Sequence, residues 1–479
     1  MTVRNTRKIL ARPMRTPAPQ YPRGRTRSVG PVIQSDAGGF WVVALSILFW
    51  LIFYQNLPWS LDGFANGFQF YAQKGAISTA NVGDRVIKVC MIVLSAYVIA
   101  ARWSLTRSVT KKFNVGAAAF LVLAPLSALW SISPDDTLLR WVSLVSIVLV
   151  CFAISVAGWH RLRLQQLAIP PLMFILIGSL VVGIIYPDRI AEIGTDISQK
   201  GAWHGITHGK NEFGMFSSIC VIICVNRWLA REGRTIWFIG GTAIAFTCLI
   251  LSKSNTSLFA TIVGVGSMVL VMRVPAIKQR FSTHVSIAIA ATILLYQLVI
   301  QDVLPGVNTL LAPIMSLTGK DTTFSARTII WNVIKQHIQG APYLGSGYGA
   351  YWVGPFPSSP SYVFIPMMFF YPTEAHNGYL DILNDLGILG LLCLLLFIIW
   401  FILQALQLMR FDRSQAALYL ALLFQEMVIN MSESDFFTRT STFAILILAT
   451  CCLSRGLVEV RRRTQPPVWP VEPPSLAGR

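Results

Sequence analysis

The sequence contains little charge. Only 13% of its 479 residues are Asp, Glu, Lys or Arg, whereas a soluble domain carries about 25%. Hydrophobic residues make up 54% of the chain and occur in long runs. This composition predicts a polytopic membrane protein, in which each spanning helix satisfies its own backbone hydrogen bonds. The formal net charge of +18 does not indicate a nucleic-acid partner, because the basic residues cluster at the chain ends and in short loops.

Several other features are absent. None of the eight cysteines lies in a polar loop, so neither a disulfide pair nor a zinc cluster is predicted. The first apolar run, Phe40–Tyr54, is not followed by an A-x-A cleavage pattern and is interpreted as a retained helix. No strict internal repeat is visible, so an inverted-repeat transporter is not supported. A magnesium-dependent nucleotide-sugar enzyme is also disfavoured, because an Asp-x-Asp pair in a soluble domain would be expected for it.

The apolar runs predict an all-α polytopic membrane protein. With about 20 residues per span, we expect about twelve transmembrane helices. The predicted organisation is a basic disordered cytoplasmic tail over 1–39, helices one to nine over 40–301, a large partly helical periplasmic loop over 302–375, helices ten to twelve over 376–457 and a cytoplasmic tail over 458–479. The expected spans are 40–57, 85–101, 113–131, 139–157, 166–186, 210–228, 236–251, 255–272, 283–301, 377–408, 415–431 and 438–455.

Charge asymmetry orients the predicted bundle. If the N-terminus is cytoplasmic and the spans alternate, most of the 39 lysines and arginines lie on the cytoplasmic side. Both termini are then cytoplasmic. The polar segments that are hardest to explain by packing all fall on the outer face, namely Lys200–Asn211, Ser252–Asn255, 302–375, His376–Asn377 and Ser432–Asp435.

A histidine and an asparagine stand at the mouth of a long apolar helix. His376 and Asn377 are followed by Gly387 and Gly390, and an ionisable residue at the membrane boundary indicates function. A hydrated histidine beside a helix cap is the alternative. On the same helix, Asp381 and Asp385 either orient basic groups or lie in a solvated part that projects from the membrane.

The outer loop contains a second candidate segment. Apolar residues at helical spacing predict a short amphipathic helix over Ser325–Gly340 that lies on the membrane. Arg327 falls in its first turn, where a cation opposes the helix dipole. An anionic partner is therefore one interpretation and a solvated arginine is the other. The glycines at 345, 347 and 349 permit a close backbone approach, a phosphate-cradling turn or an ordinary flexible turn.

The third candidate is the loop before the predicted span 210–228. His204 and His208 are four residues apart, a spacing that binds metal on a helix. The surrounding glycines argue against a helix, and no carboxylate is expected beside the histidines, so no metal site is predicted. Together with Lys210 and Asn211, they are interpreted as cationic or hydrogen-bonding groups near a helix N-terminus, which favours a phosphate.

Lys253 lies in a polar turn between two apolar spans. It is either a snorkelling lysine at the outer interface or a further cation of the same site. Cations and histidines with few acids among them suit an anionic, lipid-borne substrate such as a diphosphate.

These residues resemble a known family. His376-Asn377, nine residues, Gly387, two residues and Gly390 resemble the signature of the O-antigen ligase and O-antigen polymerase superfamily of bacterial membrane glycosyltransferases. Arg327 and Trp331 resemble its Gly-Arg-x-x-x-Trp stretch. Trp203–Asn211 with a following glycine resembles a stretch of its exopolysaccharide-polymerase branch. The resemblance covers roughly 200–435.

The resemblance implies a GT-C-like, metal-independent glycosyltransferase of a Gram-negative inner membrane that uses no cofactor. It would polymerise glycan repeats carried on a polyisoprenyl diphosphate, such as undecaprenyl diphosphate, into exopolysaccharide on the periplasmic face. His376 would act on the acceptor hydroxyl or the leaving diphosphate, and Arg327 would hold the diphosphate. The remaining substrate-binding candidates are Lys210, Lys253, His204, His208, Asn211 and Asn377.

Two alternatives remain. Ligases of this superfamily tend to carry an arginine where Ala202 stands, and Ala326 replaces the glycine before Arg327. These departures favour a polymerase over a ligase that transfers glycan to lipid A-core. A flippase or other transporter of lipid-linked glycan should instead show midplane charges and broken helices. Membrane lipids, a flippase and chain-length or export proteins are the expected partners, without nucleic acid.

Overall fold

The computed structural model describes residues 38–55, 82–191, 200–301, 325–368 and 371–464. All regular structure in these ranges is helical, apart from one isolated bridge between Ala191 and Trp203. The all-α prediction is therefore confirmed. Most of the predicted tails 1–39 and 458–479 lies outside the described residues, although the last helix continues past the expected boundary at 457 and ends at Thr464.

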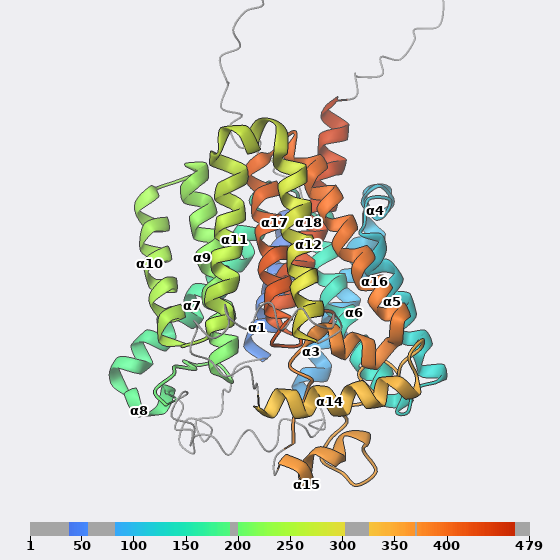
Figure 1. Cartoon of the computed structure of the whole chain (residues 1–479). Coiled ribbons are helices and arrows are strands. Elements are labelled where there is room, and N and C mark those ends of the chain that lie inside the picture. The colour runs from blue at the N-terminus through green and yellow to red at the C-terminus, as the bar shows by residue number, and fades with distance from the viewer. Residues whose placement is uncertain (1–37, 56–81, 192–199, 302–324, 369–370, 465–479) are drawn as a thin grey trace, which may run out of the picture. The chain divides into compact units, whose positions relative to one another are not determined.

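Each of the twelve predicted ranges contains a helix (Figure 1). In the described ranges, seven helices are long and apolar enough to cross a membrane, or eight if the bent pair α3 and α4 forms one span. The count of twelve spans stays a prediction. The longer helices are α1 (Gly38–Gln55), α3 (Val82–Ala101), α4 (Trp103–Thr110), α5 (Val115–Leu126), α6 (Pro134–Ala157), α7 (Arg163–Ile185), α9 (Lys210–Ala230), α10 (Thr235–Leu251), α11 (Asn255–Arg273), α12 (Ser282–Ile300), α14 (Ser325–Gly340), α16 (Gly378–Met409), α17 (Arg413–Ile429) and α18 (Ser441–Thr464).

Four of these helices begin at a side chain that caps the first turn. Asn114 before α5 accepts a hydrogen bond from the N–H of Ala117, and Ser254, Asn377 and Asp412 do the same before α11, α16 and α17. Such caps satisfy donors that the helix itself leaves unpaired. The caps at Ser254 and Asn377 matter for function, because they fix where α11 and α16 begin beside the candidate site.

Helix α17 lies in the middle of the described helices and packs against α9, α11, α12, α16 and α18. Its residues from Gln415 to Ile429 are all buried. The loop that follows it, which leads to α18, therefore emerges at the centre of one end of the bundle. This loop carries the polar cluster Ser432–Asp435 that the sequence had placed on the outer face.

Helix α14 lies across this end of the upright helices, with the short helix α15 (Phe364–Met368) beyond it (Figure 1). The helix predicted over Ser325–Gly340 is thus confirmed, with Arg327 in its first turn. Trp331 donates from Nε1 to the carbonyl of Ala375 at 2.9 Å, and Lys335 donates from Nζ to the carbonyl of Gln301 at 2.6 Å. These bonds fasten the amphipathic helix to the residues just before α16 and at the end of α12.

The long helix expected over 377–408 is not continuous. Gly387 has φ 62° and ψ −158°, so α16 is interrupted in its third turn. The loop around 342–349 fills the interruption: the N–H of Ile388 donates to the carbonyl of Pro342 at 2.9 Å, and the N–H of Gly347 donates to the carbonyl of Asp385 at 2.8 Å. A Cβ atom on Gly387 would lie 2.4 Å from the carbonyl oxygen of Tyr343. Only glycine permits this approach.

This contact decides between the interpretations of the glycine-rich turn. The N–H groups of Gly345, Gly347 and Gly349 donate to the carbonyl of Ala341, the carbonyl of Asp385 and the carboxylate of Asp385, respectively. They are therefore not available to cradle a phosphate. The turn serves a close backbone approach to the broken helix, which was one of the three readings of the sequence.

Candidate functional site

Three segments that are distant in sequence meet at the carboxylate of Glu433. Asn211, at the start of α9, donates from Nδ2 to Glu433 Oε1 at 2.7 Å. Arg327, in the first turn of α14, donates from Nη2 to the same oxygen at 2.9 Å. His376 Nδ1 lies 3.4 Å from Glu433 Oε2. The structure thus brings together three of the predicted site residues, Asn211, Arg327 and His376, around an acid in the loop between α17 and α18.

A second carboxylate completes the cluster. Glu374 Oε1 lies 3.1 Å from His376 Nδ1. The side chains of Glu374 and His376 are 31% and 32% exposed, whereas that of Glu433 is only 15% exposed. Glu374 and His376 therefore form the accessible side of the cluster, and Glu433 forms its more buried side. The expectation of few acids near the cations was wrong, because two carboxylates lie among them.

The backbone holds His376 in an unusual conformation. Its φ of +50° lies in the left-handed region, which costs a non-glycine residue about 1–3 kcal/mol and needs support from its surroundings. That support follows directly: the N–H of Gly378 donates to the carbonyls of Asn430 and Glu433 at 2.9 and 3.0 Å. A Cβ atom at Gly378 would lie 2.0 Å from Asn430 Oδ1. The start of α16 is therefore clamped to the loop that carries Glu433.

Asn377 positions this arrangement. Its side chain is fully buried, and Oδ1 accepts from the N–H of Leu380 at 3.1 Å and from Gln297 Nε2 at 3.0 Å. Nδ2 donates to the carbonyl of Met431 at 3.3 Å. These bonds link α12, α16 and the α17–α18 loop. Asn377 therefore caps α16 behind the histidine. Its hydrogen bonds account for its position without the substrate contact that was predicted for it.

The charges of the cluster depend on one another. Burial alone would lower the pKa of His376, but the attraction of Glu433 and the bonds to Glu374 and Glu433 outweigh it and raise the pKa to about 10. Burial would raise the pKa of Glu433, but His376 and Arg327 together lower it. At neutral pH the histidine is therefore an imidazolium. This state does not suit a general base and favours the other predicted role, action on the leaving diphosphate.

The two other predicted cations, Lys210 and Lys253, lie at the starts of α9 and α11. Lys210 is the first residue of α9 and precedes Asn211, which contacts Glu433. Lys253 has φ +49° and donates from Nζ to the carbonyl of Lys200 at 2.9 Å. A pocket of about 360 Å³ lies beside Lys253 at the start of α11.

Helix α11 connects this pocket to the cluster. Ser432, the neighbour of Glu433, donates from Oγ to Thr256 Oγ1 at 2.9 Å. Thr256 lies in the first turn of α11, three residues after Lys253. The turn that holds Lys253 is therefore within one helical turn of the segment that holds the central carboxylate.

The loop with His204 and His208 is not helical, as expected, and α9 begins only at Lys210. Burial lowers the pKa of His204, so this histidine is neutral at pH 7 and is not one of the cations. The N–H of His208 donates to Glu212 Oε2 at 3.1 Å. The statement that no carboxylate adjoins these histidines was therefore wrong, because Glu212 caps the segment from the first turn of α9.

The sequence reasoning missed the role of two acids. Glu433 was placed only within the outer-face segment Ser432–Asp435, and Glu374 was not singled out. A signal for Glu374 was its position two residues before His376 in an otherwise uncharged stretch. One ligand atom from each of Glu374, His376 and Glu433 lies within 4.8 Å of the others, a geometry that can hold a metal ion. Arg327, 2.9 Å from Glu433, already supplies positive charge there.

The fold and the site define an integral membrane protein of all-α class with an ion cluster at one end of its helices. Residues 240–395 match the family model described as O-antigen ligase. This range includes Lys253, Arg327, Glu374 and His376, while Asn211 and Glu433 lie outside it. The resemblance to the O-antigen ligase and O-antigen polymerase superfamily is confirmed by this match and by the relative below.

A curated relative supports the same assignment. Over 244 residues the chain is 26% identical to the exopolysaccharide production protein ExoQ of Rhizobium meliloti (strain 1021). The alignment covers 49% of this chain and 52% of that protein. The chain therefore matches about half the length of this relative.

Proposed function

We propose that this protein is a membrane glycosyltransferase that polymerises polyisoprenyl-diphosphate-linked oligosaccharide repeats into exopolysaccharide on the periplasmic face of the inner membrane. The observation that carries the proposal is the ion cluster of Arg327, His376 and Glu433 at one end of the bundle. The family match and the similarity to ExoQ, an exopolysaccharide production protein, support the glycan chemistry. A flippase would supply the lipid-linked repeats, and chain-length or export proteins would receive the polymer.

The cluster fits a diphosphate. Arg327 offers a planar fork of donors that can grip a phosphate with two parallel hydrogen bonds, and its Nη2 already donates to an anionic group, Glu433 Oε1, at 2.9 Å. His376 adds a second positive charge beside it. We propose that the diphosphate is held by these two cations, with Lys210 and Lys253 contributing from α9 and the start of α11.

The proposed step is a displacement at the anomeric carbon of the donor repeat. The acceptor hydroxyl oxygen forms a bond to that carbon, and the bond between the carbon and the diphosphate oxygen breaks with its electron pair remaining on the diphosphate. The hydroxyl proton passes to Glu374, the more exposed carboxylate of the cluster. Arg327 and the imidazolium of His376 stabilise the charge that develops on the leaving group. No metal takes part in this scheme.

The left-handed backbone at His376 fits this role. Preorganised donors act most strongly when they need not move during the reaction, and the clamp at Gly378 fixes the imidazole before substrate arrives. The backbone strain at His376 is then part of the rigid arrangement that holds the imidazole in place.

Two other functions make different predictions. A ligase would share this chemistry and differ in its acceptor, lipid A-core. A transporter is favoured by a broken helix, and α16 is broken at Gly387. However, the loop around 342–349 of the protein itself fills this break. The break lies toward the end of α16 that begins beside His376. We therefore favour the enzyme.

Glycans from a deletion strain test the proposal. Lipid-linked single repeats on the periplasmic face are expected for a lost polymerase. Long chains that are not joined to lipid A-core would instead indicate a ligase, and repeats that face the cytoplasm would indicate a flippase. A strain that carries His376→Gln at normal membrane abundance is the matched control, because it separates loss of chemistry from loss of the protein.

A further inference from the structure

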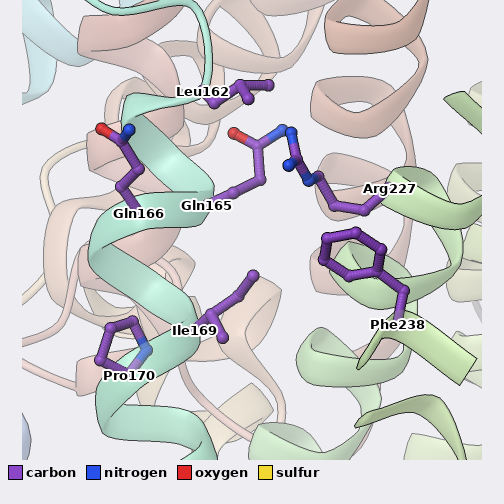
Figure 2. Close-up of a pocket in the computed structure, with 7 residues that line it drawn as sticks. All are labelled: Leu162, Gln165, Gln166, Ile169, Pro170, Arg227 and Phe238. Atoms are coloured by element: carbon purple, nitrogen blue, oxygen red, sulfur yellow. The ribbon is translucent and has the colours of Figure 1, made fainter. Parts of the chain in front are cut away.

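A second pocket lies at the opposite end of the helices from the His376 cluster. It has a volume of about 250 Å³ and is formed by the start of α7, the last turns of α9 and the start of α10. Its lining residues are Leu162, Gln165, Gln166, Ile169, Pro170, Arg227 and Phe238. Figure 2 shows Arg227 and Gln165 pointing toward one another across the pocket, with Ile169 and Phe238 deeper along the helices. The surface that faces the pocket is thus almost entirely apolar, and the polar groups of Arg227 and Gln165 lie beside one end of it.

The polar groups beside this end of the pocket have unused hydrogen-bonding capacity. Among the described residues, Arg227 makes one side-chain hydrogen bond, from Nη1 to Glu232 Oε2 at 2.9 Å, and its guanidinium lies 5.0 Å from the centre of the Phe238 ring. Gln165 is 2% exposed and donates from Nε2 to Gln415 Oε1, while its own Oε1 has no partner in the described part of the chain. Pro170 has no N–H to donate to the carbonyl of Gln166.

The surroundings of the pocket are strongly basic. His160 and Arg161 precede α7, and Arg163 is its first residue. Arg231 and Arg234 lie between α9 and α10, and the nearby acids are Glu232 and Asp412. Burial lowers the pKa of His160, and repulsion from Arg163, Arg161 and Arg227 lowers it further. A positive field of this kind at the end of membrane-spanning helices attracts anionic lipid headgroups.

We propose that this pocket binds one anionic phospholipid with a hydroxylated headgroup, such as phosphatidylglycerol, from the leaflet opposite the His376 cluster. The phosphate would take the remaining donors of Arg227, and a headgroup hydroxyl would donate to Gln165 Oε1. The first part of an acyl chain would follow Ile169, Pro170 and Phe238, which are apolar and lead toward the membrane interior. Bound lipid would join α7 to α9 and α10.

The test uses the full chain in detergent, titrated with phosphatidylglycerol and, separately, with phosphatidylcholine, and read by native mass spectrometry. We expect one saturable phosphatidylglycerol and a weaker, non-saturating association of phosphatidylcholine. Arg227→Gln removes a charge-assisted contact and should weaken phosphatidylglycerol binding on the order of tenfold. Ile169→Trp fills the apolar part while keeping every charge and should weaken it similarly.

Arg107→Gln is the matched control, because Arg107 is an exposed arginine on α4, which has no contact with the pocket. It should leave the affinity unchanged. Equal binding of the two lipids, or equal effects of the Arg227 and Arg107 variants, would overturn the proposal in favour of non-specific charge attraction. Unchanged binding in Ile169→Trp would also overturn it. Displacement of the lipid by millimolar glycerol phosphate would indicate a site for a soluble phosphate compound instead.

Discussion

The substitution Glu433→Gln isolates the centre of the proposed catalytic site. The change keeps the shape of the side chain and removes the charge that Arg327, Asn211 and His376 share. Removing one partner of a fully buried ion pair costs about 3–5 kcal/mol, whereas exposed pairs contribute at most about 1 kcal/mol. Because Glu433 is 15% exposed, we expect the variant to lose about 2 kcal/mol of stability at neutral pH.

The stability lost in Glu433→Gln should depend on pH, because Glu433 helps to raise the pKa of His376. Folding raises the pKa of His376 from its model-peptide value of 6.5 to about 10. A histidine raised in this way stabilises the fold fully below pH 6.5, and this contribution is lost as the pH rises through about 10. In Glu433→Gln the pKa of His376 falls, so the stability difference between wild type and variant should be largest near pH 6.5 and shrink toward pH 10.

Thermal melts of the detergent-solubilised protein between pH 6 and 10 measure this difference. Asp84→Asn is the control, because it removes an acid from a surface ion pair with Lys88 on α3 and touches no histidine. It should lower stability by less than about 1 kcal/mol at every pH. A pH-independent difference between wild type and Glu433→Gln would refute the idea that this carboxylate keeps His376 charged.

Three further predictions concern the proposed chemistry and orientation. Arg327→Lys keeps the charge and loses the planar fork, so polymer synthesis should fall about tenfold or more while membrane abundance is kept; near-normal polymer would make Arg327 a surface residue. His376→Gln keeps a hydrogen-bond donor without the charge, and its activity in a polymer assay should fall about 10²–10³-fold. Full activity of the Gln variant would show that the imidazolium is not needed. Reporter fusions at Gly340 and Phe411, at the two ends of the segment that contains α16, should report opposite compartments, and the same compartment for both would contradict the proposed topology.

Much of the fold could be predicted from the sequence, because the forces that set it are local. Apolar runs of spanning length become helices wherever the backbone must satisfy itself, and the expected ranges all contain helices. The 3.6-residue spacing of apolar side chains located α14 correctly, including the place of Arg327 in its first turn. Asn377 caps the helix that begins at Gly378, and a helix cap at this point was the alternative interpretation of the sequence.

The features that the sequence did not predict depend on contacts between residues that are far apart in the chain. Arg327 and Glu433 are 106 positions apart, and no local pattern identifies which of several acids will meet the arginine. The same holds for the break at Gly387: apolar residues continue on both sides of it, and its cause is the backbone of 342–349 that enters from another part of the chain. Glu374 and Glu212 lie two and four residues from a histidine, but such a spacing does not by itself show that the carboxylate contacts that histidine.

The way in which the loop fills the break in α16 has a consequence for how the protein must assemble. Backbone groups of Pro342, Gly345 and Gly347 replace helix hydrogen bonds around Gly387 or lie directly against it. An excised peptide of residues 325–377 would lose these partners, and α16 alone would expose unpaired amides near the membrane surface. The outer segment is therefore not a separable domain. It completes a membrane helix, and we expect the two to become ordered together.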